Sequence, residues 1–108
     1  MTGTQRMAEI ADFTGLGAES FVPLFENGEP RVNHLHLDAG ERIEPHRHAA
    51  RTVLFVVLDG EFELHVGSET YELPAGRVAR FDGEREFSPV AVEASTALVI
   101  LTSVSGGA

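Results

Sequence analysis

Apolar residues recur along this chain in short runs rich in β-branched and aromatic side chains, and Gly, Pro or Asp interrupts the runs roughly every ten residues. This spacing is typical of an all-β sandwich or barrel. The predicted strands are residues 32–37, 43–48, 52–58, 61–66, 70–73, 77–81, 87–93 and 97–103. Asp59-Gly60 and residues 66–69 predict tight hairpin turns, because Gly readily adopts the positive φ that such turns need.

The predicted strands differ in the faces that they bury. Residues 61–66 alternate strictly, which predicts Phe62, Leu64 and Val66 on the core side and polar side chains toward water. Residues 53–58 are apolar at both parities. A strand of this kind must be covered on both faces, by the barrel interior on one side and by a second sheet or another subunit on the other. We therefore expect a homodimer in which strand 52–58 is covered on the face that points away from the barrel interior.

The chain has 108 residues, which is the length of one domain. We expect residues 31–104 to form the barrel and residues 1–30 to form an N-terminal extension packed on it. The extension carries Asp12-Phe13 and Phe21-Val22, which are sufficient for a short strand or a helical turn. The sequence leaves both forms open.

Composition excludes several classes of function. The net charge of -9 argues against a nucleic-acid partner, which needs cations to neutralise phosphates, and against an anionic membrane surface. The chain has no Lys for a Schiff base and no Cys for a thiolate nucleophile or a disulfide. The apolar runs are too short to span a membrane, and the first residues lack the pattern of a secretory signal. We therefore expect a soluble, cytoplasmic protein that binds neither nucleic acid nor a membrane.

Two histidines mark the strongest candidate site. His46 and His48 stand two residues apart, just ahead of the apolar run 52–58. On a β-strand, residues i and i+2 project from the same face, so the two imidazoles are predicted to converge on one point. A pair of metal ligands on a sheet is built in this way.

The residues around this pair resemble the first sequence motif of the cupins. Gly40, His46-x-His48 and an apolar strand that ends at Gly60 match that motif, and residues 73–81 are similar to the link into the second one. The resemblance covers residues 32–102 and implies a double-stranded β-helix, also called a jelly roll, in which two antiparallel sheets enclose a pocket. It also implies a dimer. The ordinary cupin holds Fe, Mn, Zn, Ni or Cu in the pocket through three His and one Glu.

Compared with the ordinary cupin motifs, the ligand set of this chain is incomplete. The usual Glu falls on Val53, the third His falls on Glu86, and the Asn of the second motif falls on Val90. His46, His48 and Glu86 nevertheless match the two-His-one-carboxylate set that binds iron with open coordination positions. Glu86 follows Glu84 and Arg85 just after a predicted turn, so the alternative is a solvated loop residue.

Two functions remain open from the sequence. The first is a metal-dependent oxygenase or isomerase for a small organic molecule, with a divalent transition metal (Fe, Mn, Zn or Ni) on His46 and His48, and Glu86 as third ligand or general base. A buried His pair without a role would leave polar groups to satisfy, which favours metal binding. The alternative is a metal-free or non-catalytic cupin that binds or senses a small ligand. Its pocket residues would be Val53, Phe55 and Val57, with Arg51 or Arg47 holding an anionic group.

The sequence predicts that the remaining histidines lie outside the pocket. His34-Leu35-His36 repeats the spacing, but Leu35 and Leu37 fit the inward parity better, which predicts His34 and His36 on the outer face or at an interface. His65 lies on the polar side of the alternating strand and is predicted to be a surface residue.

Overall fold

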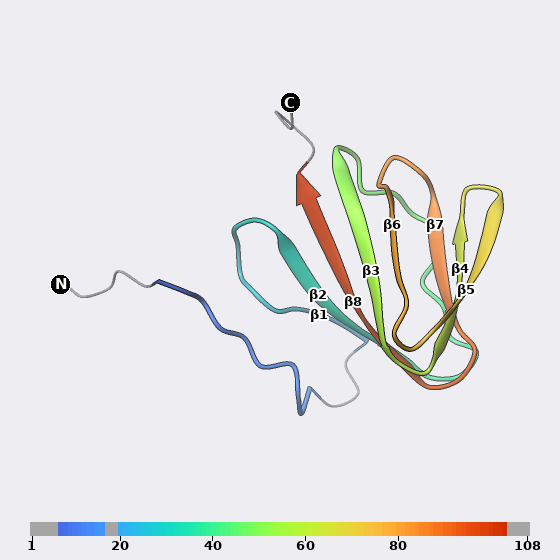
Figure 1. Ribbon diagram of the computed structural model, residues 1–108, viewed down its shortest axis with the longest axis horizontal. Coiled ribbons are helices and arrows are strands. Elements are labelled where there is room, and N and C mark those ends of the chain that lie inside the picture. The colour runs from blue at the N-terminus through green and yellow to red at the C-terminus, as the bar shows by residue number, and fades with distance from the viewer. Residues whose placement is uncertain (1–6, 17–19, 104–108) are drawn as a thin grey trace.

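The computed structural model describes residues 7–16 and 20–103, and within them it contains only strands, turns and irregular segments. A five-stranded and a three-stranded antiparallel sheet face each other, as Figure 1 shows. The larger sheet has the order β1 (Phe21–Pro23), β2 (Arg31–Leu37), β8 (Ser95–Ser103), β3 (Arg51–Asp59) and β6 (Val78–Asp82). The smaller one has the order β5 (Glu69–Pro74), β4 (Glu61–Val66) and β7 (Phe87–Ala91). The predicted fold of two antiparallel sheets is confirmed.

Most predicted strands are present, with ends that differ by one or two residues. Residues 43–48 are the exception, and the prediction of a strand there is wrong. This segment runs beside β7 and is joined to it at isolated positions, among them hydrogen bonds from Ile43 N to Pro89 O (3.0 Å) and from His46 N to Phe87 O (3.0 Å). Pro45 and Pro89 have no N–H to donate, so a continuous ladder cannot form between the two segments.

The prediction of a hairpin at Asp59-Gly60 is also wrong. β3 pairs with β8 and β6, whereas β4 pairs with β5 and β7, so the chain passes at this point from one sheet to the other. Gly60 does have a positive φ of 80°, and a Cβ there would collide with Ser95 Oγ and the carbonyl oxygen of Ala94. The turn predicted at 66–69 is confirmed, because Gly67 (φ 59°) joins β4 to its antiparallel partner β5.

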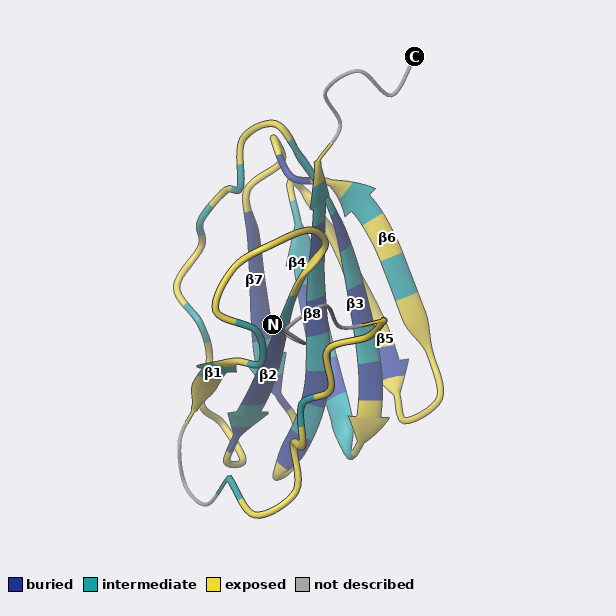
Figure 2. Ribbon diagram, turned by 90° about the vertical axis from the view of Figure 1, so that its left-hand side faces the viewer, coloured by how far each residue is buried: buried dark blue, intermediate teal, exposed yellow. Residues whose placement is uncertain are grey.

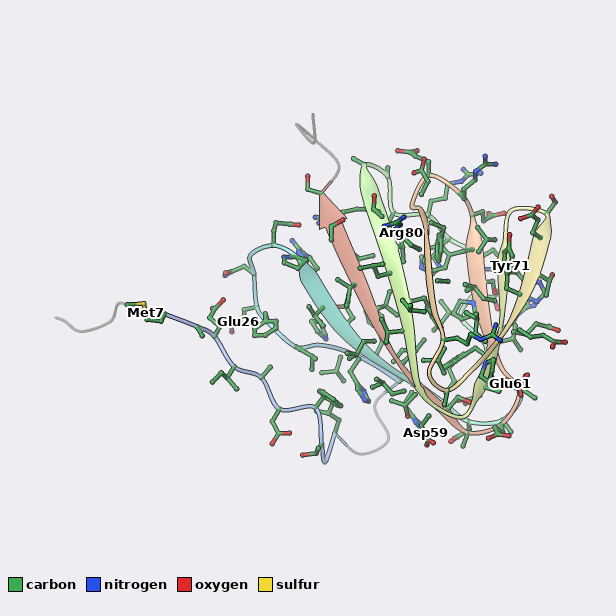
Figure 3. The ribbon with its side chains drawn as sticks, viewed as in Figure 1. Met7, Glu26, Asp59, Glu61, Tyr71 and Arg80 are labelled. Atoms are coloured by element: carbon green, nitrogen blue, oxygen red, sulfur yellow. The ribbon has the colours of Figure 1, made fainter. Side chains whose placement is uncertain are left out.

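The core lies between the sheets, where side chains fill the space (Figure 3). Phe55 of β3 and Phe62 of β4 pack edge to face across it, with ring centroids 5.1 Å apart, which is a favourable aromatic geometry. Along β3 and β8, buried and half-buried residues alternate, as the colour bands in Figure 2 show. The predicted inward positions Phe62 and Leu64 are fully buried.

The outer face of the larger sheet carries a second apolar layer. Leu54 pairs with Ile100 and Val56 with Leu98, and all four side chains are half-buried within one chain. In Figure 1, residues 7–16 lie beside β1 and β2, on the side away from the smaller sheet. From this segment Phe13 stacks on His34 with ring centroids 5.6 Å apart.

Some predictions fall partly outside the described residues, since residues 1–6 and 17–19 belong to the predicted extension and residue 104 to the predicted barrel. No helix that could cross a membrane occurs in the ranges 7–16 and 20–103.

Candidate functional site

A cavity of about 400 Å³ lies between the two sheets. Residues of both sheets and of the segment before β3 line it, and most of them are apolar. The lining residues are Phe21, Leu35, Ile43, Glu44, Pro45, His46, His48, Phe55, Phe87, Pro89 and Val99. A largely apolar hollow with a few polar groups in one corner is the usual form of a small-molecule site.

His46 and His48 form the polar corner of this cavity. Their rings meet edge to face with centroids 4.9 Å apart, so the structure brings the predicted pair together. Both rings lie against Phe87, at centroid distances of 4.4 Å for His46 and 5.7 Å for His48. Phe87 itself packs against Phe81, which fixes the aromatic wall behind the pair.

A backbone contact determines the tautomer of His46. Its Nδ1 lies 2.9 Å from the carbonyl oxygen of Glu44. A carbonyl can only accept, so Nδ1 carries the hydrogen and donates it. The other ring nitrogen, Nε2, is then left with its lone pair. Sequence reasoning missed this partner, because the contact depends on the irregular path of the chain around Pro45.

The position of His48 depends on a tight contact between two loops. His48 N donates to Gly83 O (2.8 Å), and Gly83 N donates to Arg51 O (2.7 Å). A Cβ on residue 83 would collide with the carbonyl oxygen of His48 and lie 2.7 Å from that of Arg51. Between His48 and Arg51, Ala50 takes a left-handed φ of 63°, which is unfavourable for a residue with a Cβ. Gly83 therefore allows the close approach that holds His48 in place.

The electrostatic setting of His48 favours its neutral form. Burial is the largest cause, and the positive charges of protonated His46 and of Arg51 add to it; together they lower the pKa of His48 below the ordinary histidine value of 6.5. Near neutral pH the ring is therefore uncharged, with one nitrogen able to accept a hydrogen bond or a proton.

The third predicted metal ligand lies elsewhere. Glu86 is exposed, just ahead of β7, and is not part of the cavity wall. Val53, at the position of the usual Glu, is completely buried in the core. Among the residues that the structure describes, no three His, Cys, Asp or Glu side chains are grouped so that they could hold a metal ion. The donor set therefore does not fit the three-His-one-Glu centre of an ordinary cupin.

The predicted pocket residues occupy three different places. Phe55 lines the cavity, whereas Val53 and Val57 are buried in the core without reaching its wall. Arg51 lines a neighbouring cavity of about 370 Å³, and Arg47 is exposed and lines neither. Inward parity on strand 87–93 could have identified Phe87. Nothing local could have identified Phe21, because it reaches the cavity only through the pairing of β1 with β2.

The chain belongs to the cupin family. The family defined by the cupin domain matches residues 33–104, which include most of β2, all of β3 to β8 and the His pair. A search of curated protein sequences gives no significant match.

Solved structures share the fold at low sequence identity. An RmlC-like cupin from Methanocaldococcus jannaschii with a double-stranded β-helix fold matches with a TM-score of 0.75 and 13% identity over 92% of this chain and 93% of that chain. An RmlC-like cupin from Desulfovibrio desulfuricans matches with a TM-score of 0.75 and 20% identity over 87% and 97%. A predicted oxalate decarboxylase from Thermotoga maritima has a TM-score of 0.71 and 18% identity over 77% and 78%. At such identities the likeness concerns the fold alone.

Proposed function

We propose that this cupin binds a small, largely apolar organic molecule in the cavity between its sheets, beside His46 and His48. The observation that carries the proposal is the cavity itself, about 400 Å³ of mostly apolar wall with one imidazole corner. The apolar wall would supply affinity, and the two rings would orient a polar group of the ligand. We expect the cytoplasm as the location.

The imidazoles also support proton chemistry on the bound molecule. The hydrogen bond to Glu44 O leaves Nε2 of His46 with its lone pair, and the pKa of His48 is lowered, chiefly by burial. Either ring can therefore accept a proton from a ligand hydroxyl or an acidic C–H, as a general base does in an isomerisation. This chemistry requires no residue outside the described pair.

Binding can be tested with neutral probes and a cavity-filling variant. Octanamide, 3-phenylpropanamide and indole-3-acetamide are titrated by calorimetry and ligand-detected NMR. At least one should bind to the native chain, and Val99→Phe should abolish binding because the added ring fills the cavity. The matched control is Val92→Phe at an exposed position outside the cavity. If none of these amides and none of their carboxylates binds, or if Val99→Phe leaves binding unchanged, the proposal fails.

A metal-dependent oxygenase or isomerase is the second candidate, and the fixed tautomer of His46 favours it, since a ligating histidine uses one nitrogen while the other donates a hydrogen bond. His46, His48 and Glu86 would be the ligands for Fe, Mn, Zn or Ni, but the exposed Glu86 does not fit that set as the chain stands. Elemental analysis of protein purified without chelator or added metal tests this candidate. About one transition-metal ion per chain supports this candidate. If the protein contains no such ion, a tightly bound metal is excluded.

We also propose a homodimer in which a second copy of this chain covers the outer face of the larger sheet. Half-buried apolar side chains of β3 and β8 form the centre of this face, which suits an isologous interface. Light scattering at micromolar concentration should give the mass of two chains. A monomeric mass contradicts the proposal.

A further inference from the structure

A second cavity adjoins the first at the end of the barrel where β3 begins. It has a volume of about 370 Å³ and shares Phe21 and His48 with the apolar cavity. Its wall is more polar and includes the side chains of Arg31, Arg51 and Asn33. A ligand whose body fills the apolar cavity can therefore extend past His48 into surroundings that suit a charged group.

Arg51 is the cation best placed for such a group. It is the first residue of β3 and has the same parity as Val53 and Phe55, so its side chain starts on the inner face of the sheet. The side chain is only 24% exposed, whereas Arg47 is exposed and lines neither cavity. Of the two arginines that the sequence offers for an anionic group, Arg51 and Arg47, the structure therefore favours Arg51.

Arg51 already holds a carboxylate. Its Nη1 donates to both oxygens of Glu29, at 2.8 and 2.9 Å. Glu29 lies in the loop between β1 and β2, and its side chain is 48% exposed. An ion pair with so much solvent access contributes little stability, because water competes for both charges. The guanidinium of Arg51 is thus positioned to bind a carboxylate, and another carboxylate can readily displace that of Glu29.

We propose that the ligand is an apolar carboxylate whose carboxyl group displaces Glu29 from Arg51 while its body occupies the apolar cavity. The inference rests on the proposed function, since it needs a ligand in that cavity. A carboxylate joined to a bound apolar body is held close to Arg51, so it competes at a high effective concentration. Glu29 then acts as a resident competitor that occupies the charged subsite when no ligand is present.

The other charged groups of the second cavity are compatible with this role. Arg31, an exposed residue, adds a second positive charge to the wall, and Glu26, labelled in Figure 3, adds a negative one from the same loop as Glu29. Among the residues that the structure describes, Arg51 forms its ion pair with Glu29 and not with Glu26. The contact with Glu29 is therefore the one that a ligand has to replace.

The test compares each amide probe with its carboxylate: octanoate, 3-phenylpropionate and indole-3-acetate. Affinities are measured by calorimetry for the native chain, Arg51→Gln, Glu29→Gln and the double variant. Arg47→Gln is the matched control, because it removes the same charge from the segment just before β3 without touching either cavity. Circular dichroism and melting curves establish that each variant folds. The double variant removes both charges of the ion pair, so it can be tested even if the single variants are unstable.

At least one carboxylate should bind more tightly than its amide in the native chain. Arg51→Gln should weaken that carboxylate by roughly tenfold or more, the usual effect of losing a hydrogen bond to a charged group, and should leave the amide unchanged. Glu29→Gln should tighten the carboxylate, because the competitor is removed. Arg47→Gln should change neither.

Four results overturn the inference. If amides bind as tightly as carboxylates, or if Arg51→Gln weakens both equally, the anionic subsite is refuted while the proposed apolar site stands. If Glu29→Gln weakens the carboxylate, displacement is refuted, because Glu29 then supports binding. If no probe of either kind binds, the proposed function fails first and the inference fails with it.

Discussion

The chain contains two His-x-His pairs, and they lie in opposite environments. His46 and His48 face the cavity between the sheets, on an irregular segment, whereas His34 and His36 lie on the outer face of the regular strand β2. The spacing is identical. In both pairs the two rings lie on one side of the chain, although only His34 and His36 stand on a strand. The apolar residues around each pair decide whether that side is the inside.

The two pairs also differ in how their ring nitrogens are satisfied. His46 Nδ1 donates to a carbonyl, and His36 contacts Thr96 Oγ1 (3.2 Å) and Asp38 Oδ1 (3.3 Å). His34 is only 7% exposed, and within the described residues its Nδ1 is a buried nitrogen with no hydrogen-bond partner. Such a group lowers stability. The outer pair therefore lowers the stability of the fold through the unpaired nitrogen of His34, whereas the inner pair faces a cavity that can hold a ligand.

The largest expected effect comes from placing a carboxylate at position 53, where the ordinary cupin motif has Glu and this chain has Val. Val53 is completely buried, so Val53→Glu should lower the free energy of unfolding by roughly 3 kcal/mol or more, since a carboxyl group loses its hydration without a partner. Fe(II), Mn(II) or Zn(II) should not restore the melting temperature. Thr52→Glu, on the opposite face of β3, is the control and should cost much less. A metal-dependent gain in melting temperature for Val53→Glu would instead show that residue 53 can join the His pair.

The second prediction removes the support behind His48. Gly83→Ala introduces a Cβ that collides with the carbonyl oxygen of His48, so the loop must move, at a cost of about 1–3 kcal/mol in unfolding free energy. The ring of His48 should shift with it, and the chemical shifts of the imidazole should change. Arg85→Ala, an exposed change in the same loop, is the control. Unchanged His48 resonances in a folded Gly83→Ala protein would show that this contact does not position the ring.

The third prediction concerns pH and the outer pair. Burial, with a smaller contribution from the positive charge of His36 when protonated, lowers the pKa of His34 below 6.5. The unfolded chain then binds the proton more readily, so stability is full above pH 6.5 and falls as the pH drops below it toward the lowered pKa. The pKa of His48 is also lowered and adds a slope of the same sign.

Substitution separates these two contributions. His34→Phe keeps an aromatic ring under Phe13 and removes the unsatisfied nitrogen, so it should raise stability by about 1 kcal/mol near neutral pH and reduce, without abolishing, the loss below pH 6.5. His36→Gln is the matched change in the same pair and should reduce the slope less than His34→Phe does, because it removes only the smaller cause of the lowered pKa of His34. Urea unfolding between pH 5 and pH 8 measures both. An unchanged slope in His34→Phe would assign the whole effect to other groups.

The smallest expected effect tests why the outer pair is buried at all. Phe13 stacks on His34, so Phe13→Ala should expose the ring and move the pKa of His34 back toward 6.5, with a loss of stability of about 0.5–1.5 kcal/mol. An NMR titration of the His34 ring follows the pKa directly. Ile10→Ala, at a fully exposed position of the same segment, is the control. If the pKa of His34 stays where it was, β2 and its neighbours bury the ring without help from Phe13.

Local sequence predicted much of the candidate site. The parity rule predicted that His46 and His48 would share one face. It also predicted that Leu35 and Leu37 would face the core and turn His34 and His36 away from it, and Leu35 and Leu37 are buried in the core. The same reasoning could not place Glu86. One residue of register decides whether a side chain at the start of β7 faces the cavity or the solvent, and Phe87 takes the inward position.

Local patterns were sufficient to predict most of the strands, their inward faces and the family, because the side-chain period of a strand and the order of the motifs are properties of neighbouring residues. The sheet that each strand joins depends on long-range pairing, which separated β3 from β4 where the turn signal predicted a hairpin. The tertiary structure also decided the contact between Glu29 and Arg51, the carbonyl partner of His46 and the cover of Phe13 over His34. These depend on the path of segments distant or irregular in the chain, and that path is set by the packing of the whole barrel.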